Sequence, residues 1–164
     1  MKIRVGSDEF NAWHEVGHAT VCLHYGGDLY GIELMQGSGV ARGCEVGPDK
    51  KRDLACGGFA VQYRLMRTER VAGVDPNDAG AVAAYSEHVF SFSWNDQEDF
   101  IGRRITEDNQ FTKQEKEAFM WYAIERVDPI FDHYLPAMQE LVRELCETRR
   151  VEGRRVKELL LGPR

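Results

Sequence analysis

Apolar residues recur at helical spacing along most of the chain, and only one short stretch alternates in the way that strands do. The first helical stretch follows Ser7 and Asp8, either of which can act as its N-cap, and it ends at Gly26-Gly27. Most positions between residues 10 and 23 are apolar, without a proline. The pattern therefore predicts a buried helix near the start of the chain.

The alternating stretch covers residues 29–36 and is followed by Gly37-Ser38-Gly39 and a second short run over residues 40–46. This arrangement predicts a β-hairpin. Pro48-Asp49 then opens a second helical stretch that runs to about residue 67. Gly57-Gly58 in its middle costs helix propensity, so we expect this pair to permit close packing against another helix.

The rest of the chain has helical periodicity. Asp75-Pro76 supplies an N-cap and a proline at the first helical position, which predicts a helix to about residue 90. Further helices are expected at about 95–105, 112–149 and 153–161, and we expect Pro129 and Pro136 to break or kink the long one. The predicted fold is a single mainly α (α+β) domain over residues 1–164, with a small β-hairpin or sheet beside the first helix and C-terminal helices.

The composition and charge of the chain indicate which kinds of molecule it does not bind. Charged residues make up 29% of the 164 residues and the formal net charge is -6, so the chain offers no basic field for nucleic acid. No apolar run approaches the roughly 18 residues of a membrane span, and the N-terminus has no signal-peptide layout. The four cysteines form no C-x-x-C pair. We therefore expect a cytoplasmic protein that binds neither nucleic acid nor membrane.

Candidate chemistry lies in the first predicted helix, where residues 14–18 read His-Glu-Val-Gly-His. At about 3.6 residues per turn, His14 and His18 project from one face and can each give a nitrogen to one tetrahedral Zn²⁺. Glu15 lies one step round the helix, where its carboxylate can take the proton from a zinc-bound water and later deliver it to a leaving amine. The spacing predicts two zinc ligands and a general base, and it leaves the third ligand open.

The order of elements and two motifs resemble the peptidase domain of the FtsH-type AAA metalloproteases. Residues 14–19 read His-Glu-Val-Gly-His-Ala, similar to the family's His-Glu-Ala-Gly-His-Ala, and a hairpin and a second helix follow. That helix has Gly-Gly-Phe-Ala-Val-Gln where the family has a Gly-Gly-Arg-Ala-Ala-Glu-like core, so Phe59 and Gln62 depart from the pattern. The resemblance covers about residues 10–105, with residues 68–91 as an insertion, and it implies a zincin-like helical domain extended by helices over about 112–161.

The resemblance implies an aspartate as third zinc ligand, in a segment similar to Thr-Gly-Ala-x-Asn-Asp-Leu. Residues 91–97 read Ser-Phe-Ser-Trp-Asn-Asp-Gln, so Asp96 matches while Gln97 departs from the leucine. Asp99 is the rival because an apolar residue, Phe100, follows it. On a helix, Asp96 flanks the apolar side and Asp99 points nearly opposite, which favours Asp96.

A second candidate ligand is His24, which lies six residues after His18, where metzincins place their third histidine. In metzincins a glycine lets the chain leave the helix before that histidine, and here Val21 occupies its place. A continuing helix would turn His24 off the ligand face. We therefore expect His24 to lie at the helix end, near the C-terminal dipole.

These residues predict a zinc-dependent metallopeptidase in which His14, His18 and Asp96 bind Zn²⁺ and Glu15 is the catalytic base. The resemblance implies substrate binding as a strand added to the hairpin, and peptides or unfolded segments as substrates. No P-loop pattern occurs in the sequence, so such an enzyme would act without ATP on its own, as a possible homo-oligomer or with a separate ATPase. The alternatives are a non-proteolytic binding module on the same fold and a zinc hydrolase of another amide or ester.

Overall fold

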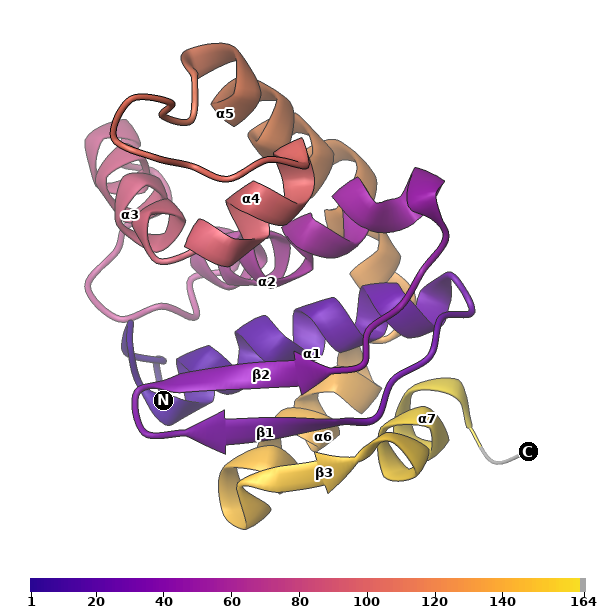
Figure 1. Ribbon diagram of the computed structural model, residues 1–164. Helices are drawn as coiled ribbons and strands as arrows, with labels where there is room; N and C mark the ends of the chain where they lie inside the picture. Colours follow the sequence, from indigo (N-terminus) through magenta and orange to yellow (C-terminus); the bar gives the residue numbers. More distant parts are fainter. Residues whose placement is uncertain (163–164) are drawn as a thin grey trace.

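The structure is a computed structural model, and it describes residues 1–162. It is mainly helical with one small antiparallel sheet, which confirms the predicted fold class. Figure 1 shows α1 between the sheet and α2, with α3, α4 and α5 beyond α2. The elements in chain order are α1 (Asp8–His24), β1 (Gly31–Met35), β2 (Ser38–Arg42), a 3-10 turn (Pro48–Lys50), α2 (Lys51–Arg67), α3 (Ala79–Ser91), α4 (Trp94–Ile101), α5 (Lys113–Trp121), α6 (Leu135–Thr148), β3 (Arg150–Glu152) and α7 (Gly153–Leu161).

Helix α1 is the central element and packs against the sheet, α2, α6 and α7. Its N-cap is Ser7, whose hydroxyl accepts a hydrogen bond from the backbone N–H of Phe10 at 3.2 Å. Its side chains are buried on nearly every face, including the large ring of Trp13, so the helix is held by tertiary packing more than by a single apolar stripe. The buried apolar residues of the chain form one cluster around it.

The crossing of α1 and α2 is unusually close because glycines meet there. A Cβ atom added to Gly17 would overlap the carbonyl of Gly57, and one added to Gly57 would lie 3.0 Å from Gly17 and from the Cα of His18. The expectation that Gly57-Gly58 permits close helix packing is confirmed. The absent side chains let the two backbones touch.

The hairpin is present, but its second strand differs from the prediction. Strand β2 covers Ser38–Arg42 and not residues 40–46, because Gln36 and Gly37 make a tight turn that pairs Met35 with Ser38. Gly37 has a φ of +74°, which favours glycine. Strand β3 was not predicted; it pairs antiparallel with β1 and produces the strand order β2-β1-β3. Within residues 1–162, one edge of β2 therefore has no partner strand.

Two predicted helix boundaries were wrong. Asp75 does not cap α3: its carboxylate accepts from the N–H of Asn77 at 2.9 Å within a turn, and Asp78 caps the helix by accepting from Gly80 at 2.8 Å. The helix predicted to reach residue 105 ends earlier, at Ile101. Gly102 terminates it in the left-handed conformation, with a φ of +71°.

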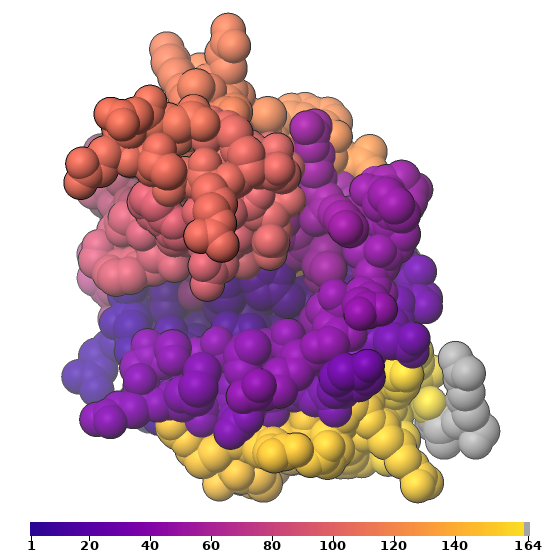
Figure 2. Space-filling view, viewed as in Figure 1, coloured from indigo at the N-terminus to yellow at the C-terminus, as the bar shows by residue number. Residues whose placement is uncertain are grey.

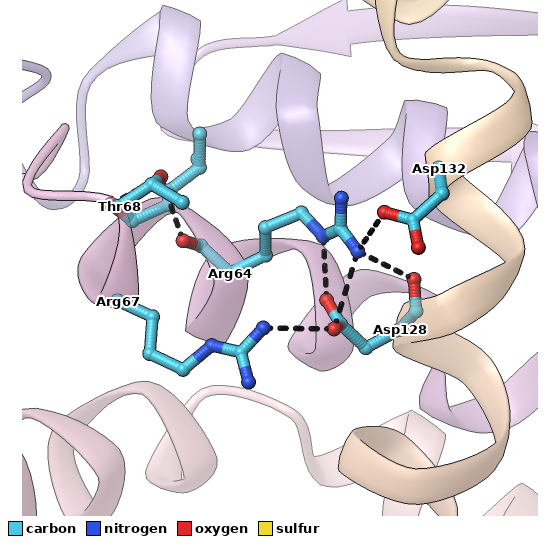
Figure 3. A network of polar contacts seen from close by, with 6 residues as sticks. Arg64, Arg67, Thr68, Asp128 and Asp132 are labelled. Atoms are coloured by element: carbon cyan, nitrogen blue, oxygen red, sulfur yellow. Dashed lines mark hydrogen bonds and ion pairs between the residues drawn. The ribbon is translucent and has the colours of Figure 1, made fainter.

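Pro129 and Pro136 interrupt the long C-terminal helix as predicted. After α5 the chain makes a π-helical segment (Tyr122–Val127) and a 3-10 segment (Asp128–His133) before α6 begins. Figure 3 shows how this irregular part is fixed to α2: Arg64 contacts Asp128 at 2.6 Å and Asp132 at 2.7 Å, and Arg67 contacts Asp128 at 3.0 Å. Among residues 1–162, no helix is both long and apolar enough to cross a bilayer.

A second ion pair joins the same region to the start of α2. Asp53 is fully buried and accepts from Arg126 at 2.9 Å through both oxygens and from the Tyr25 hydroxyl at 2.7 Å. Burial raises the pKa of Asp53, but Arg126 and Tyr25 outweigh burial, so its pKa lies below the usual value.

We predict that Asp53→Asn lowers the free energy of unfolding by about 1–3 kcal/mol at neutral pH, because an ionic acceptor of buried hydrogen bonds is lost. A carboxylate with a lowered pKa stabilises the fold above the unfolded-state pKa of about 3.9, and this contribution disappears as pH falls through the folded-state pKa. The difference between wild type and variant should therefore be constant above about pH 5 and shrink below pH 4. Urea unfolding of metal-free protein between pH 3 and 7 measures it; a difference that grows in acid would contradict the assignment.

Candidate metal centre

Two imidazoles meet on the α2-facing side of α1. The Nε2 atoms of His14 and His18 lie 3.1 Å apart, as the four-residue spacing on a helix predicts. Both side chains are mostly buried, with 19% and 11% exposed.

Asp96 in the first turn of α4 completes the cluster. Its Oδ2 lies 3.1 Å from Nε2 of His14 and 3.3 Å from Nε2 of His18. Helix α4 is fixed by Gln97, whose buried Nε2 donates to the carbonyl of Phe90 at 2.6 Å, and by Phe100, which packs into the aromatic core. Gln97 was a departure from the family pattern at the sequence level, and here it ties α4 to the end of α3.

Helix α2 orients both histidines from behind. Nδ1 of His18 donates to the carbonyl of Leu54 at 2.8 Å, and Nδ1 of His14 donates to Oε1 of Gln62 at 3.1 Å. Gln62 also donates from Nε2 to the carbonyl of Phe10 at 3.4 Å, which places its oxygen toward the imidazole. Because each Nδ1 donates its proton to an oxygen, the neutral form of each ring has its lone pair on Nε2, which points into the cluster.

Gly58 makes room for His14. A Cβ atom at this position would overlap the imidazole ring. Leu54, Gly58 and Gln62 are four residues apart, so they form one face of α2. On that face Leu54 accepts a hydrogen bond from His18, Gly58 leaves space for the ring of His14, and Gln62 accepts a hydrogen bond from His14.

The cluster fits a metal ion in its donor chemistry and its dimensions. Among residues 1–162, one group of three side chains could bind a metal ion: His14, His18 and Asp96. The donor atoms of these side chains all lie within 4.8 Å of one another. Zinc with ligands at about 2.0–2.1 Å in a tetrahedron has donor atoms separated by about 3.3 Å, and the three observed separations are 3.1, 3.1 and 3.3 Å. Two lone pairs and a carboxylate that converge in this way favour a cation between them.

The pKa values of these side chains also indicate that the cluster favours a cation. Burial lowers the pKa of His18, but the carboxylate of Asp96 outweighs burial and raises it to about 9; the pKa of His14 is also raised. Burial raises the pKa of Asp96, and the two imidazoles reverse this and hold it below its usual value. Positive charge is thus favoured at this point of the molecule.

Glu15 lies beside the cluster, under strand β2. Its side chain is buried and passes so close to Gly39 that any Cβ there would overlap it. The strand can approach the carboxylate because position 39 has no side chain. Glu15 therefore lies between helix α1 and the face of β2 at Gly39.

The cluster opens into a groove of about 1480 Å³ between β2 and the helices α3 and α4. In Figure 2 the groove separates the β2 segment from the α3 and α4 segments, and α1 is visible at its floor. His14, Glu15, His18 and Asp96 all line it. The predicted insertion (68–91) contributes to this wall through the end of α3.

The structure distinguishes the candidate ligands. Asp99 lines the same groove but is not part of the three-residue cluster, and burial and the charge of Asp96 raise its pKa. His24 lies at the end of α1, as expected, where its Nδ1 is 3.1 Å from the hydroxyl of Tyr134. Contacts with the histidines were not predicted for Leu54, Gly58 and Gln62, although their four-residue spacing on a predicted helix was a usable signal.

No protein-family model matches this chain, and a search of curated proteins finds no match. The resemblance to the FtsH-type peptidase domain therefore stays a prediction that depends on two motifs and the order of elements.

We predict that Gly58→Ala impairs metal binding with little cost to the fold. The new methyl group displaces the imidazole of His14, while alanine adds up to about 1 kcal/mol of helix propensity. Gly17→Ala is the contrasting variant, because its methyl group meets the backbone carbonyl of Gly57 and should lower the unfolding free energy by about 1–3 kcal/mol as well as disturb the site. Zinc content measures metal binding by each variant, and thermal unfolding without metal measures the stability of its fold. Normal zinc binding by Gly58→Ala would contradict the assignment of His14 as a zinc ligand.

We also predict that Asp96→Ala abolishes stoichiometric zinc binding while Asp99→Ala retains it. Only Asp96 places an oxygen within 3.3 Å of both imidazoles. Elemental mass spectrometry on the two purified variants, after incubation with zinc and desalting, gives the result. Loss of zinc from Asp99→Ala alone would show that the other carboxylate is the ligand.

Proposed function

We propose that this protein is a zinc-dependent metallopeptidase that hydrolyses peptide bonds in peptides or unfolded protein segments. The observation that carries the proposal is the convergence of His14, His18 and Asp96 with Glu15 in one groove, beside the unpaired edge of β2. A binding module would have no use for a buried carboxylate next to such a cluster.

Each side chain has a defined part. His14, His18 and Asp96 hold the ion, and Leu54 and Gln62 keep the imidazole lone pairs directed at it. When bound, zinc supplies Lewis acidity, which lowers the pKa of a water and polarises a carbonyl group. Glu15 accepts the proton from the attacking water and later gives it to the leaving amine.

Strand β2 supplies the substrate-binding surface in this proposal. One of its edges pairs with β1, and the other has free backbone N–H and C=O groups. An extended peptide can add to that edge through main-chain hydrogen bonds. Such binding requires an extended chain, so folded proteins are not substrates unless a partner, such as a separate ATPase, unfolds them.

The shape of the site favours a polypeptide over a small amide or ester. The groove runs along β2 and is lined by residues from β2, α1, α3 and α4. A hydrolase of a small molecule needs a closed pocket that surrounds its substrate. The open groove beside a free strand edge matches an extended substrate.

We expect about one zinc ion per chain and metal-dependent cleavage of casein. Glu15→Gln should keep the zinc and lower the cleavage rate by roughly 10²–10⁴-fold, because the general base is lost while the ligands remain. Elemental mass spectrometry and gel analysis of casein digests measure the two properties on the same preparations.

The other outcomes are distinct. Absence of zinc after reconstitution would overturn the proposal and leave a binding module. Zinc binding with cleavage of small amides or esters but not of casein would assign the fold to a different hydrolase.

A further inference from the structure

We propose, on the basis of the proposed function, that an aromatic rim on the groove selects substrates with a large apolar side chain near the cleaved bond. The aromatic rim consists of His88, Phe92 and Trp94, at the junction of α3 and α4. It would make segments with phenylalanine, tyrosine, leucine or a similar residue the preferred substrates.

Phe92 and Trp94 are exposed in a way that packing does not explain. Their relative exposures are 75% and 46%, whereas Phe90, two residues earlier, is buried. Both line the groove, whereas the exposed aromatic residues Tyr30 and Trp121 do not. Aromatic rings left in water beside a candidate catalytic centre are typical of ligand contacts.

The rim is preorganised by its local contacts. The ring of Phe92 packs edge-on against His88, with centroids 4.9 Å apart and an interplanar angle of 83°. The indole N–H of Trp94 donates to Glu98 at 3.1 Å, and the same carboxylate oxygen accepts from the N–H of Ile105 at 3.0 Å. A ring already held in place loses little conformational entropy when a ligand binds.

The opposite wall recognises a different part of the substrate. Residues 37–41 of the hairpin are glycine, serine, glycine, valine and alanine, so this wall offers backbone groups and small side chains. Side chains alternate in direction along a bound strand, so some leave the plane of main-chain pairing. The aromatic rim is an exposed apolar surface of the groove that can contact a large one.

The test uses zinc-loaded Glu15→Gln protein, which retains bound peptide, and fluorescein-labelled ten-residue peptides of alanine, serine and glycine. One set carries a single phenylalanine at successive positions, and a matched set carries alanine there. By fluorescence anisotropy we expect at least one phenylalanine peptide to bind roughly tenfold more tightly than its alanine counterpart.

Phe92→Ala and Trp94→Ala, each combined with Glu15→Gln, should reduce that preference to less than threefold. Trp121→Ala is the matched control, since it removes an exposed indole outside the groove and should leave the preference unchanged. Zinc content of every variant confirms that the cluster is intact, and Phe92→Leu should restore most of the preference.

Equal binding of the phenylalanine and alanine peptides, or a preference that survives both rim substitutions, would overturn the inference. Casein cleavage that persists under either result would show that the peptidase assignment holds and only the aromatic subsite is wrong. Failure of the unsubstituted protein to bind zinc would instead overturn the peptidase assignment.

Discussion

The contact between the backbones of Gly17 and Gly57 determines the geometry of the whole site. Because neither residue has a side chain, the backbones of α1 and α2 come into contact where the helices cross, and the residues around the crossing are brought together. Leu54 and Gln62 reach the histidines only at this separation. A wider crossing would leave both Nδ1 atoms without acceptors and the imidazoles free to rotate.

The third candidate ligand, Asp96, comes from another part of the chain, and its position depends on further contacts. Gln97 holds α4 to the end of α3, and Phe100 anchors the same helix against Phe119 at a centroid distance of 5.2 Å. The cluster therefore depends on the packing of α4 as well as on the crossing of α1 and α2. A bound cation would link α4 to α1, which would couple metal affinity to the packing of α4.

Features that depend on interactions between residues close in the sequence were predicted, and features that depend on contacts between distant residues were not. Helices α1 and α7 depend on local signals, and they were predicted closely. The hairpin was predicted too, but its second strand lies at Ser38–Arg42 and not at residues 40–46. The spacing of His14 and His18 and the face of α4 that carries Asp96 are also local features. The strand β3 was missed because three residues carry no periodicity, and the cap of α3 was misplaced because Asp75-Pro76 also suits a turn. The hydrogen bonds from α2 to the histidines were not predictable, since they depend on where one helix crosses another.

The three-stranded sheet also bears on how a strand edge can stay available without pairing to a second copy of the protein. An unpaired edge invites such pairing. At one side of the sheet β3 is only three residues long and carries Arg150 and Glu152 at exposed positions, which discourages extension. At the other side β2 lies along a groove whose opposite wall is formed by α3 and α4, and this wall restricts the approach of a flat sheet from another copy. The wall of the groove thus discourages edge-to-edge aggregation.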